Sequence, residues 1–157
     1  MFAPEPVRSA AFADLRAGTA HDRAIDVSAT GAAFAPDGRR LAVAGRNGEV
    51  LLLDAGGIAV RAAVTAHDGP AGPVSWSADG RMFVVGGSDG RVTVWDGRTG
   101  EPLGALAPAA PGVRTYPVFR PDGHTVMVVS TDGAVHTWDA RPSEWVARAC
   151  RIAASGC

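Results

Sequence analysis

Short turn motifs recur along this chain at a nearly constant spacing, and this repetition limits the folds that the chain can adopt. The repeated turn residues are Asp37, Asp79 and Asp122, then Asn47, Asp89 and Asp132, and finally Asp54, Asp96 and Asp139. In each of these three series the spacing is 42 residues and then 43 residues. Motifs that keep their phase in this way predict three copies of one structural unit, each packed against its neighbours.

The clearest copy covers residues 76–96 and reads as three short strands joined by two tight turns. Both turns contain Asp-Gly, which suits a tight turn because glycine adopts positive φ without steric cost and Asp hydrogen-bonds to nearby backbone. Apolar runs at 82–85 and 92–95 flank the second turn, which is a hairpin pattern. A fourth strand-sized segment follows, so the repeat has the length and content of a β-propeller blade.

The second strand of each unit supports this interpretation. Residues 41–44, 82–85 and 126–129 are unbroken apolar runs, whereas a sheet with one face in water alternates apolar and polar residues. Such runs predict strands covered on both faces, as in a blade packed between two neighbours. An immunoglobulin-like sandwich would expose one face of each sheet.

The three copies resemble the WD-repeat β-propeller family over residues 25–139. The resemblance rests on Phe-x-Pro-Asp-Gly at 34–38 and 119–123, on the second turns, and on the Trp-Asp pairs at 95–96 and 138–139. It implies an all-β fold, namely a partial β-propeller of about three four-stranded antiparallel blades. A short C-terminal helix is expected after the last blade, because Trp145, Ala149 and Ile152 have helical spacing.

The expected boundaries follow the repeat. Residues 1–28 are either an N-terminal arm or the remnant of a preceding blade, and blade one, blade two and blade three cover 29–66, 67–112 and 113–140. The C-terminal helix and tail take 141–157, and blade three lacks an outer strand.

Three blades do not close a ring, so either the chain is the C-terminal portion of a longer propeller or two copies complete each other. An open arc would expose a stacking face and a strand edge.

The resemblance also implies a structural hydrogen-bonded network of His, Ser or Thr, Asp and Trp within a blade. The matching residues here are His67, Asp89, Trp95, Asp132 and Trp138. The hydroxyl position, on the second strand, is occupied by Val43, Val85 and Val128, so no blade has the full set.

No pattern in the sequence predicts catalytic, cofactor-binding or metal-binding residues. The four His residues lack ligand spacing, and Asp37, Asp79 and Asp122 stand where the turns require them. The glycine-rich stretch 86–90 lacks the Lys-Ser/Thr and the helix of a phosphate-binding loop.

The composition argues against nucleic acid and membranes as partners. Net charge is −1, and the basic residues, which are all Arg, are interleaved with acidic ones. No apolar run approaches the ~18 residues of a membrane span, and no secretory signal is recognisable. We therefore expect a cytoplasmic location, a bacterial source from the exclusive use of Arg, and reduced thiols at Cys150 and Cys157.

The predicted function is that of a non-enzymatic protein-interaction scaffold or sensor module, which the resemblance places beside a bacterial ATPase or kinase domain. Partners would contact loops that emerge on one face, at Arg46, Asn47, His67, Asp68, Ser88, Arg114 and Thr131. Self-association that completes the propeller is a further expectation. The alternatives are a propeller hydrolase or lactonase-like enzyme and a non-functional truncated fragment of a larger WD-repeat ATPase or kinase.

Overall fold

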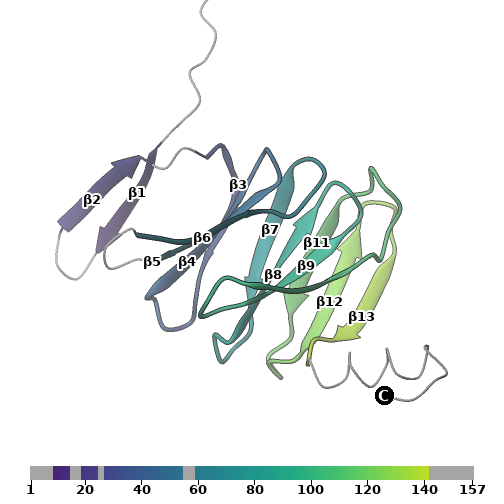
Figure 1. The fold of residues 1–157 in the computed structure, drawn as a ribbon. Coiled ribbons are helices and arrows are strands. Elements are labelled where there is room, and N and C mark those ends of the chain that lie inside the picture. Colours follow the sequence, from purple (N-terminus) through teal and green to yellow (C-terminus); the bar gives the residue numbers. More distant parts are fainter. Residues whose placement is uncertain (1–8, 15–18, 25–26, 55–58, 142–157) are drawn as a thin grey trace, which may run out of the picture.

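The computed structural model describes residues 9–14, 19–24, 27–54 and 59–141, with side chains for 27–54 and 62–141. These ranges contain thirteen strands, arranged in four antiparallel sheets, and no helix (Figure 1). The prediction of an all-β fold is therefore confirmed. The predicted C-terminal helix lies outside the described residues.

Each sheet follows the order of the sequence, so every strand pairs with the next one along the chain. Blade one consists of β3 (Ala29–Phe34), β4 (Arg40–Gly45), β5 (Glu49–Asp54) and β6 (Ala59–Thr65). Blade two consists of β7 (Ala71–Trp76), β8 (Met82–Gly87), β9 (Val92–Asp96) and β10 (Pro102–Leu106). Blade three consists of β11 (Thr115–Phe119), β12 (Thr125–Ser130) and β13 (Val135–Asp139).

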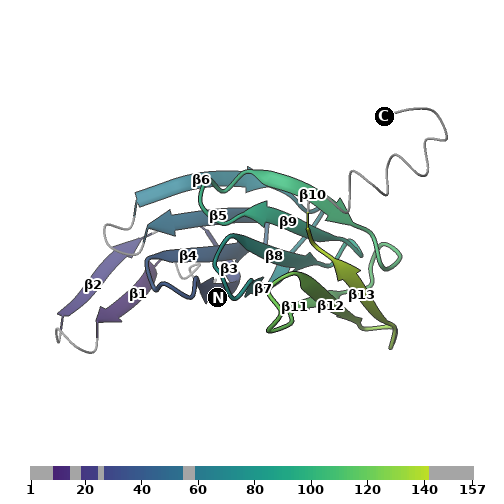
Figure 2. The same cartoon turned by 90° about the horizontal axis from the view of Figure 1, so that it is seen from below.

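The sheets stand side by side in an open arc (Figures 1 and 2). Figure 2 shows β6 and β10 along the convex rim, with β3, β7 and β11 toward the concave side. The region predicted as an arm or as a blade remnant contains β1 (Ser9–Asp14) and β2 (Thr19–Ala24), which pair antiparallel. This two-stranded sheet lies beside blade one, at the opposite end of the arc from blade three.

Two apolar clusters hold neighbouring blades together, and in each of them one blade packs its side chains against the opposite face of the next blade. Between blades one and two the cluster includes Ala42, Val50 and Leu52 from blade one and Trp76, Phe83 and Val85 from blade two. Between blades two and three it includes Val84, Val92 and Val94 from blade two and Phe119, Val126 and Val128 from blade three. We call the face of a blade that packs against the following blade its forward face, and the face that packs against the preceding blade its rear face. Since burying one such side chain contributes roughly 1.5–3 kcal/mol, these clusters dominate the stability of the arc.

Polar contacts fix the angle between blades. The indole Nε1 of Trp76 donates to the carbonyl oxygen of Ala33 at 2.9 Å, and the backbone N–H of Phe119 donates to Ser75 Oγ at 3.0 Å. The guanidinium of Arg40 lies 5.4 Å from the ring centroid of Trp76 and donates to the carbonyl oxygen of Gly97 at 2.6 Å. The three hydrogen bonds join residues more than forty positions apart in sequence.

The prediction that the second strands are covered on both faces is correct for blades one and two and wrong for blade three. Residues 41–44 and 83–85 are buried, whereas residues 126–129 alternate between buried and exposed. Met127 and Val129 are 38% and 42% exposed. The physical reason is that, among the described residues, no sheet covers the forward face of blade three. Within the described ranges that blade has three strands, in agreement with the prediction that it lacks an outer strand.

Candidate protein-interaction surface

Loops between strands converge on one side of the arc, at the top in Figure 1. We call this surface the loop face, and it comprises residues 46–48, 66–70, 88–91, 107–114 and 131–134. Backbone hydrogen bonds join consecutive loops: the N–H of His67 donates to Gly48, that of Ser88 to Pro70, that of Gly112 to Ser88 and that of Thr131 to Arg114, at 3.0–3.3 Å. The loops are therefore held in fixed relative positions.

A buried hydrogen-bonded network lies directly beneath the loop face in blade two. His67 Nδ1 lies 3.0 Å from Asp89 Oδ1, and His67 Nε2 lies 3.0 Å from Thr93 Oγ1. Trp95 Nε1 donates to the same hydroxyl at 2.9 Å. Gly87 makes room for this network, because a Cβ there would lie 2.2 Å from His67 Nδ1 and 2.4 Å from Asp89 Oδ1.

The carboxylate of Asp89 anchors two loops to this network. It accepts hydrogen bonds from the backbone N–H of Asp68 at 3.2 Å and from that of Arg91 at 3.1 Å. Burial raises the pKa of Asp89, but the hydrogen bonds from His67 and the backbone outweigh it, so the net pKa is lowered. The ionised carboxylate therefore couples the loop before β7 to the turn between β8 and β9.

The structure corrects the expected source of the hydroxyl. The resemblance places it on the second strand, where Val85 stands, yet the hydroxyl comes from Thr93 on β9. Thr93 is directly opposite Val85 in the β8–β9 register. A Thr inside the third strand, two residues before the closing Trp, is the sequence signal that could have found it.

The comparable residues of blade three are not joined in such a network. The carboxylate of Asp132 accepts the backbone N–H of Ala134 at 3.1 Å, which is a turn contact. Trp138 packs against the cluster between blades two and three, and its ring lies 5.2 Å from that of His136. In place of the network, Thr115 Oγ1 accepts the N–H of Gly87 at 3.0 Å.

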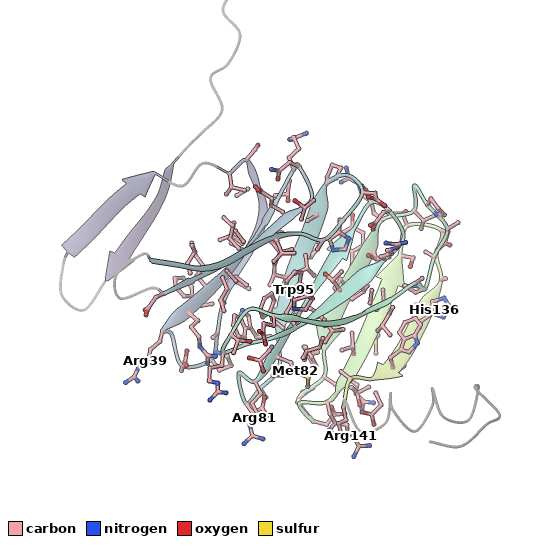
Figure 3. All side chains as sticks on the ribbon, viewed as in Figure 1. Arg39, Arg81, Met82, Trp95, His136 and Arg141 are labelled. Carbon is pink, nitrogen blue, oxygen red and sulfur yellow. The ribbon has the colours of Figure 1, made fainter. Side chains whose placement is uncertain are left out.

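The opposite side of the arc, the turn face, is formed by the turns at 35–40, 77–82, 96–101 and 120–125. Asp37, Asp79 and Asp122 each accept the backbone N–H two residues further on, at 2.9–3.0 Å. A backbone hydrogen bond is the main cause of the lowered pKa of all three: from Arg39 for Asp37, from Arg81 for Asp79 and from Thr125 for Asp122. Figure 3 shows Arg39, Arg81 and Arg141 projecting from this side.

A groove of about 540 Å³ opens on the turn face between blades two and three. Its apolar floor includes Met82, Leu103 and Pro121, and Asp79, Asp96, Asp122, Arg81, Arg141 and His124 also line it. The carboxylates of Asp79, Asp96 and Asp122 accept backbone hydrogen bonds within their own turns. Within the described ranges, no cluster of three or more His, Cys, Asp or Glu residues could hold a metal ion.

Comparison with known proteins shows what part of this chain is similar to. The family model "WD domain, G-beta repeat" matches residues 62–96, which run from β6 to the end of β9. This segment is therefore similar to one WD repeat. WD repeat-containing protein 1 of Xenopus tropicalis is 38% identical over 66 residues, which are 40% of this chain and 11% of that protein.

Solved structures show the same fold. A chain in the crystal structure of the mitotic checkpoint complex superposes with a TM-score of 0.74 at 22% identity, covering 85% of this chain and 41% of that one. The structure of U3-55K gives a TM-score of 0.67 at 16% identity, covering 74% of this chain and 37% of that one. The arc is therefore similar to part of a propeller and spans about two fifths of the chains that it resembles.

Most of the predicted contact residues are exposed to solvent. Arg46, Asn47, Asp68, Arg114 and Thr131 are exposed on the loop face, and Ser88 is half-buried. The prediction that His67 contacts a partner does not agree with its position. Its side chain has no exposed area, and its ring nitrogens lie within hydrogen-bond distance of Asp89 and Thr93. His67 therefore supports the loops from below and is not available to a partner.

Among the residues that the structure describes, no helix is long and apolar enough to span a membrane.

Proposed function

We propose that the loop face is a docking surface for another protein and that the chain acts as a non-enzymatic interaction module. WD-repeat proteins act as protein-interaction scaffolds, and this supports a protein as the partner. The observation that carries the proposal is the combination of exposed polar loop residues with a rigid support beneath them. Binding to preordered loops costs little conformational entropy, which favours recognition.

The chemistry of the loop face indicates a polar, mixed-charge partner surface. Exposed Arg46 and Arg114 alternate with Asp68 and Asp132 across the three blades. Such an arrangement selects partners by the order of charges more than by total charge. A role as scaffold or sensor beside an ATPase or kinase domain is the finer form of this proposal, and it rests on the resemblance alone.

The test uses the full chain as bait in extracts of its source cells. We expect reproducible enrichment of one protein, with loss of that protein when Arg46→Glu and Arg114→Glu are combined on the loop face. The matched control is Arg39→Glu with Arg81→Glu, which reverses two exposed charges on the turn face and leaves capture unchanged. Equal capture by both double variants would contradict docking on the loop face, and turnover of ester or lactone substrates would favour an enzyme.

A further inference from the structure

The forward face of blade three is an exposed grid of uncharged side chains. The register places Tyr116, Val129 and Val135 in one row and Val118, Met127 and Thr137 in the next. The exposed fractions of the five largest are 40% for Tyr116, 42% for Val129, 60% for Val135, 57% for Val118 and 38% for Met127. Contiguous apolar surface of this kind marks an interaction site.

The corresponding grids of the other two blades are covered and are built from smaller residues on their inner strands. In blade one the three inner positions hold Gly31, Ala33 and Ala44, and in blade two they hold Pro73, Ser75 and Gly86. A Cβ on Gly31 would lie 2.5 Å from the carbonyl oxygen of Gly72, and one on Gly86 would lie 2.1 Å from that of Thr115. The inner strand of each following blade therefore packs with its backbone directly against these positions.

Blade three does not permit the same close approach. Its three inner positions hold Tyr116, Val118 and Val129, and each is larger than its two counterparts. A following blade that packed as β11 packs on blade two would clash with these side chains. The face requires a partner that meets it at the wider separation of two sheets with interdigitating side chains, about 10 Å.

In a second copy of the chain, the rear face of blade one is not free for head-to-tail stacking. The rear face of blade one holds Leu41, Val43, Leu51 and Leu53, which form a buried cluster with Val27. Their exposed fractions do not exceed 7%. The face that a second copy does offer is the forward face of its own blade three.

We propose that two copies of this chain pack through the forward faces of blade three, related by a two-fold axis. The two rows described above are uncharged, and Asp139, which the register places in the row beyond them, is paired with Arg141, so two identical copies do not repel each other. The Val, Met and Tyr side chains of the face are of the kind that fill sandwich cores. A two-fold contact needs only a self-complementary patch, and it closes after two subunits.

The size of the face sets the expected affinity. Three strands of five or six residues give a patch of roughly 17 Å by 14 Å. The total area buried is then well below the ~1,200 Å² of a stable specific interface and lies in the range of weak, transient contacts, so we expect a dissociation constant on the order of 10 µM or weaker. The dimer should therefore dissociate on dilution.

The experiment is sedimentation velocity of the full chain from about 1 µM to about 500 µM, a range that brackets this affinity. We expect a monomer of 16.0 kDa that converts to a dimer with increasing concentration. Met127→Glu should abolish the dimer, because a charge would then be buried at the centre of the contact. Leu103→Glu is the matched control: Leu103 is 39% exposed on β10, outside the face, and its change should leave the dimer intact.

Three results would overturn this proposal. A monomer at every concentration would exclude the dimer, and a series of species larger than a dimer would indicate head-to-tail stacking. The third result is a chain that stays monomeric and whose melting temperature falls with Met127→Glu but not with Leu103→Glu. Such a result would show that Met127 is covered within a single copy of the chain. Circular dichroism of both variants establishes that they remain folded.

Discussion

Thr93 on β9 stands directly opposite Val85 on β8, and the Thr93 hydroxyl lies 3.4 Å from the Val85 carbonyl oxygen. From this position the hydroxyl also meets His67 Nε2 and the indole N–H of Trp95. Side chains opposite each other in an antiparallel pair project from the same face of the sheet, with Cβ atoms about 5 Å apart. A hydroxyl on either strand therefore enters the same buried space, and blade two places it on β9.

The first prediction concerns this hydroxyl. Thr93→Val keeps the shape of the side chain but leaves buried polar groups of His67 and Trp95 without their partner. We expect the free energy of unfolding to fall by about 2 kcal/mol, the typical cost of leaving buried polar groups unsatisfied. Urea unfolding measures this loss, and Thr93→Ser, which keeps the hydroxyl, should lose less than about 1 kcal/mol.

The same geometry predicts a rescue. Adding Val85→Thr to Thr93→Val returns a hydroxyl to the opposite strand, so part of the lost free energy of unfolding should be recovered. Single, double and wild-type chains form a double-mutant cycle in which the two sites are coupled by at least about 0.5 kcal/mol. Additive losses in the double variant would show that only β9 can present the hydroxyl correctly.

Much of the fold was predictable because the repeat fixes the turns and the strands together. Asp79 and Asp89 sit in the turns that the period assigned to them, each accepting backbone N–H groups. The role of Thr93 was not predictable from the motif, because the motif assigns the hydroxyl to one sequence position on the second strand. The network requires only that a hydroxyl oxygen lie within hydrogen-bond distance of His67 and Trp95. A hydroxyl on the opposite strand reaches the same place in the blade from a different sequence position.

The exposure of residues 126–129 was missed for a different reason. An apolar run shows that both faces of a strand can be covered, but it does not show that a neighbour is present. Met127 and Val129 have the same apolar character as Val84 and Val85, yet only the latter two are buried. Burial depends on the rest of the assembly, which the sequence of one strand does not contain.

A second prediction concerns the contact between blades two and three. Gly86→Ala places a Cβ 2.1 Å from the carbonyl oxygen of Thr115, so β11 must move away from β8. We expect a loss of about 2–3 kcal/mol in the free energy of unfolding, as for overpacked cores. Val129→Ala, at the equivalent position of blade three, should cost less than about 1 kcal/mol in dilute solution because Val129 is 42% exposed. Equal costs at the two positions would contradict the close approach of β11.

A third prediction concerns the different contributions of two adjacent arginines, Arg39 and Arg40, to the free energy of unfolding. The side chain of Arg40 is 16% exposed and links blade one to the carbonyl of Gly97 in blade two, whereas Arg39 projects into solvent. Arg40→Met should lower the free energy of unfolding by about 2 kcal/mol, because it removes a charged hydrogen bond and a cation–π contact. Arg39→Met, measured in parallel by urea unfolding, should change it by less than about 0.5 kcal/mol. Similar losses for both variants would show that the contact between the blades contributes little.

The last prediction is the pH dependence of the turn that begins blade three's second strand. Backbone N–H groups of Thr125 and His124 donate to Asp122 at 2.8 Å and 3.0 Å, and they lower its pKa from 3.8 to about 2. Because the folded-state pKa is depressed, the ionised carboxylate contributes stability above about pH 4 and loses it as pH falls through about 2. Asp122→Asn keeps an oxygen acceptor without the charge, so its melting temperature should lie below that of the wild type by a constant amount above pH 5. That gap should close between about pH 4 and pH 2, and a gap that stays constant down to pH 2 would show that the charge plays no part.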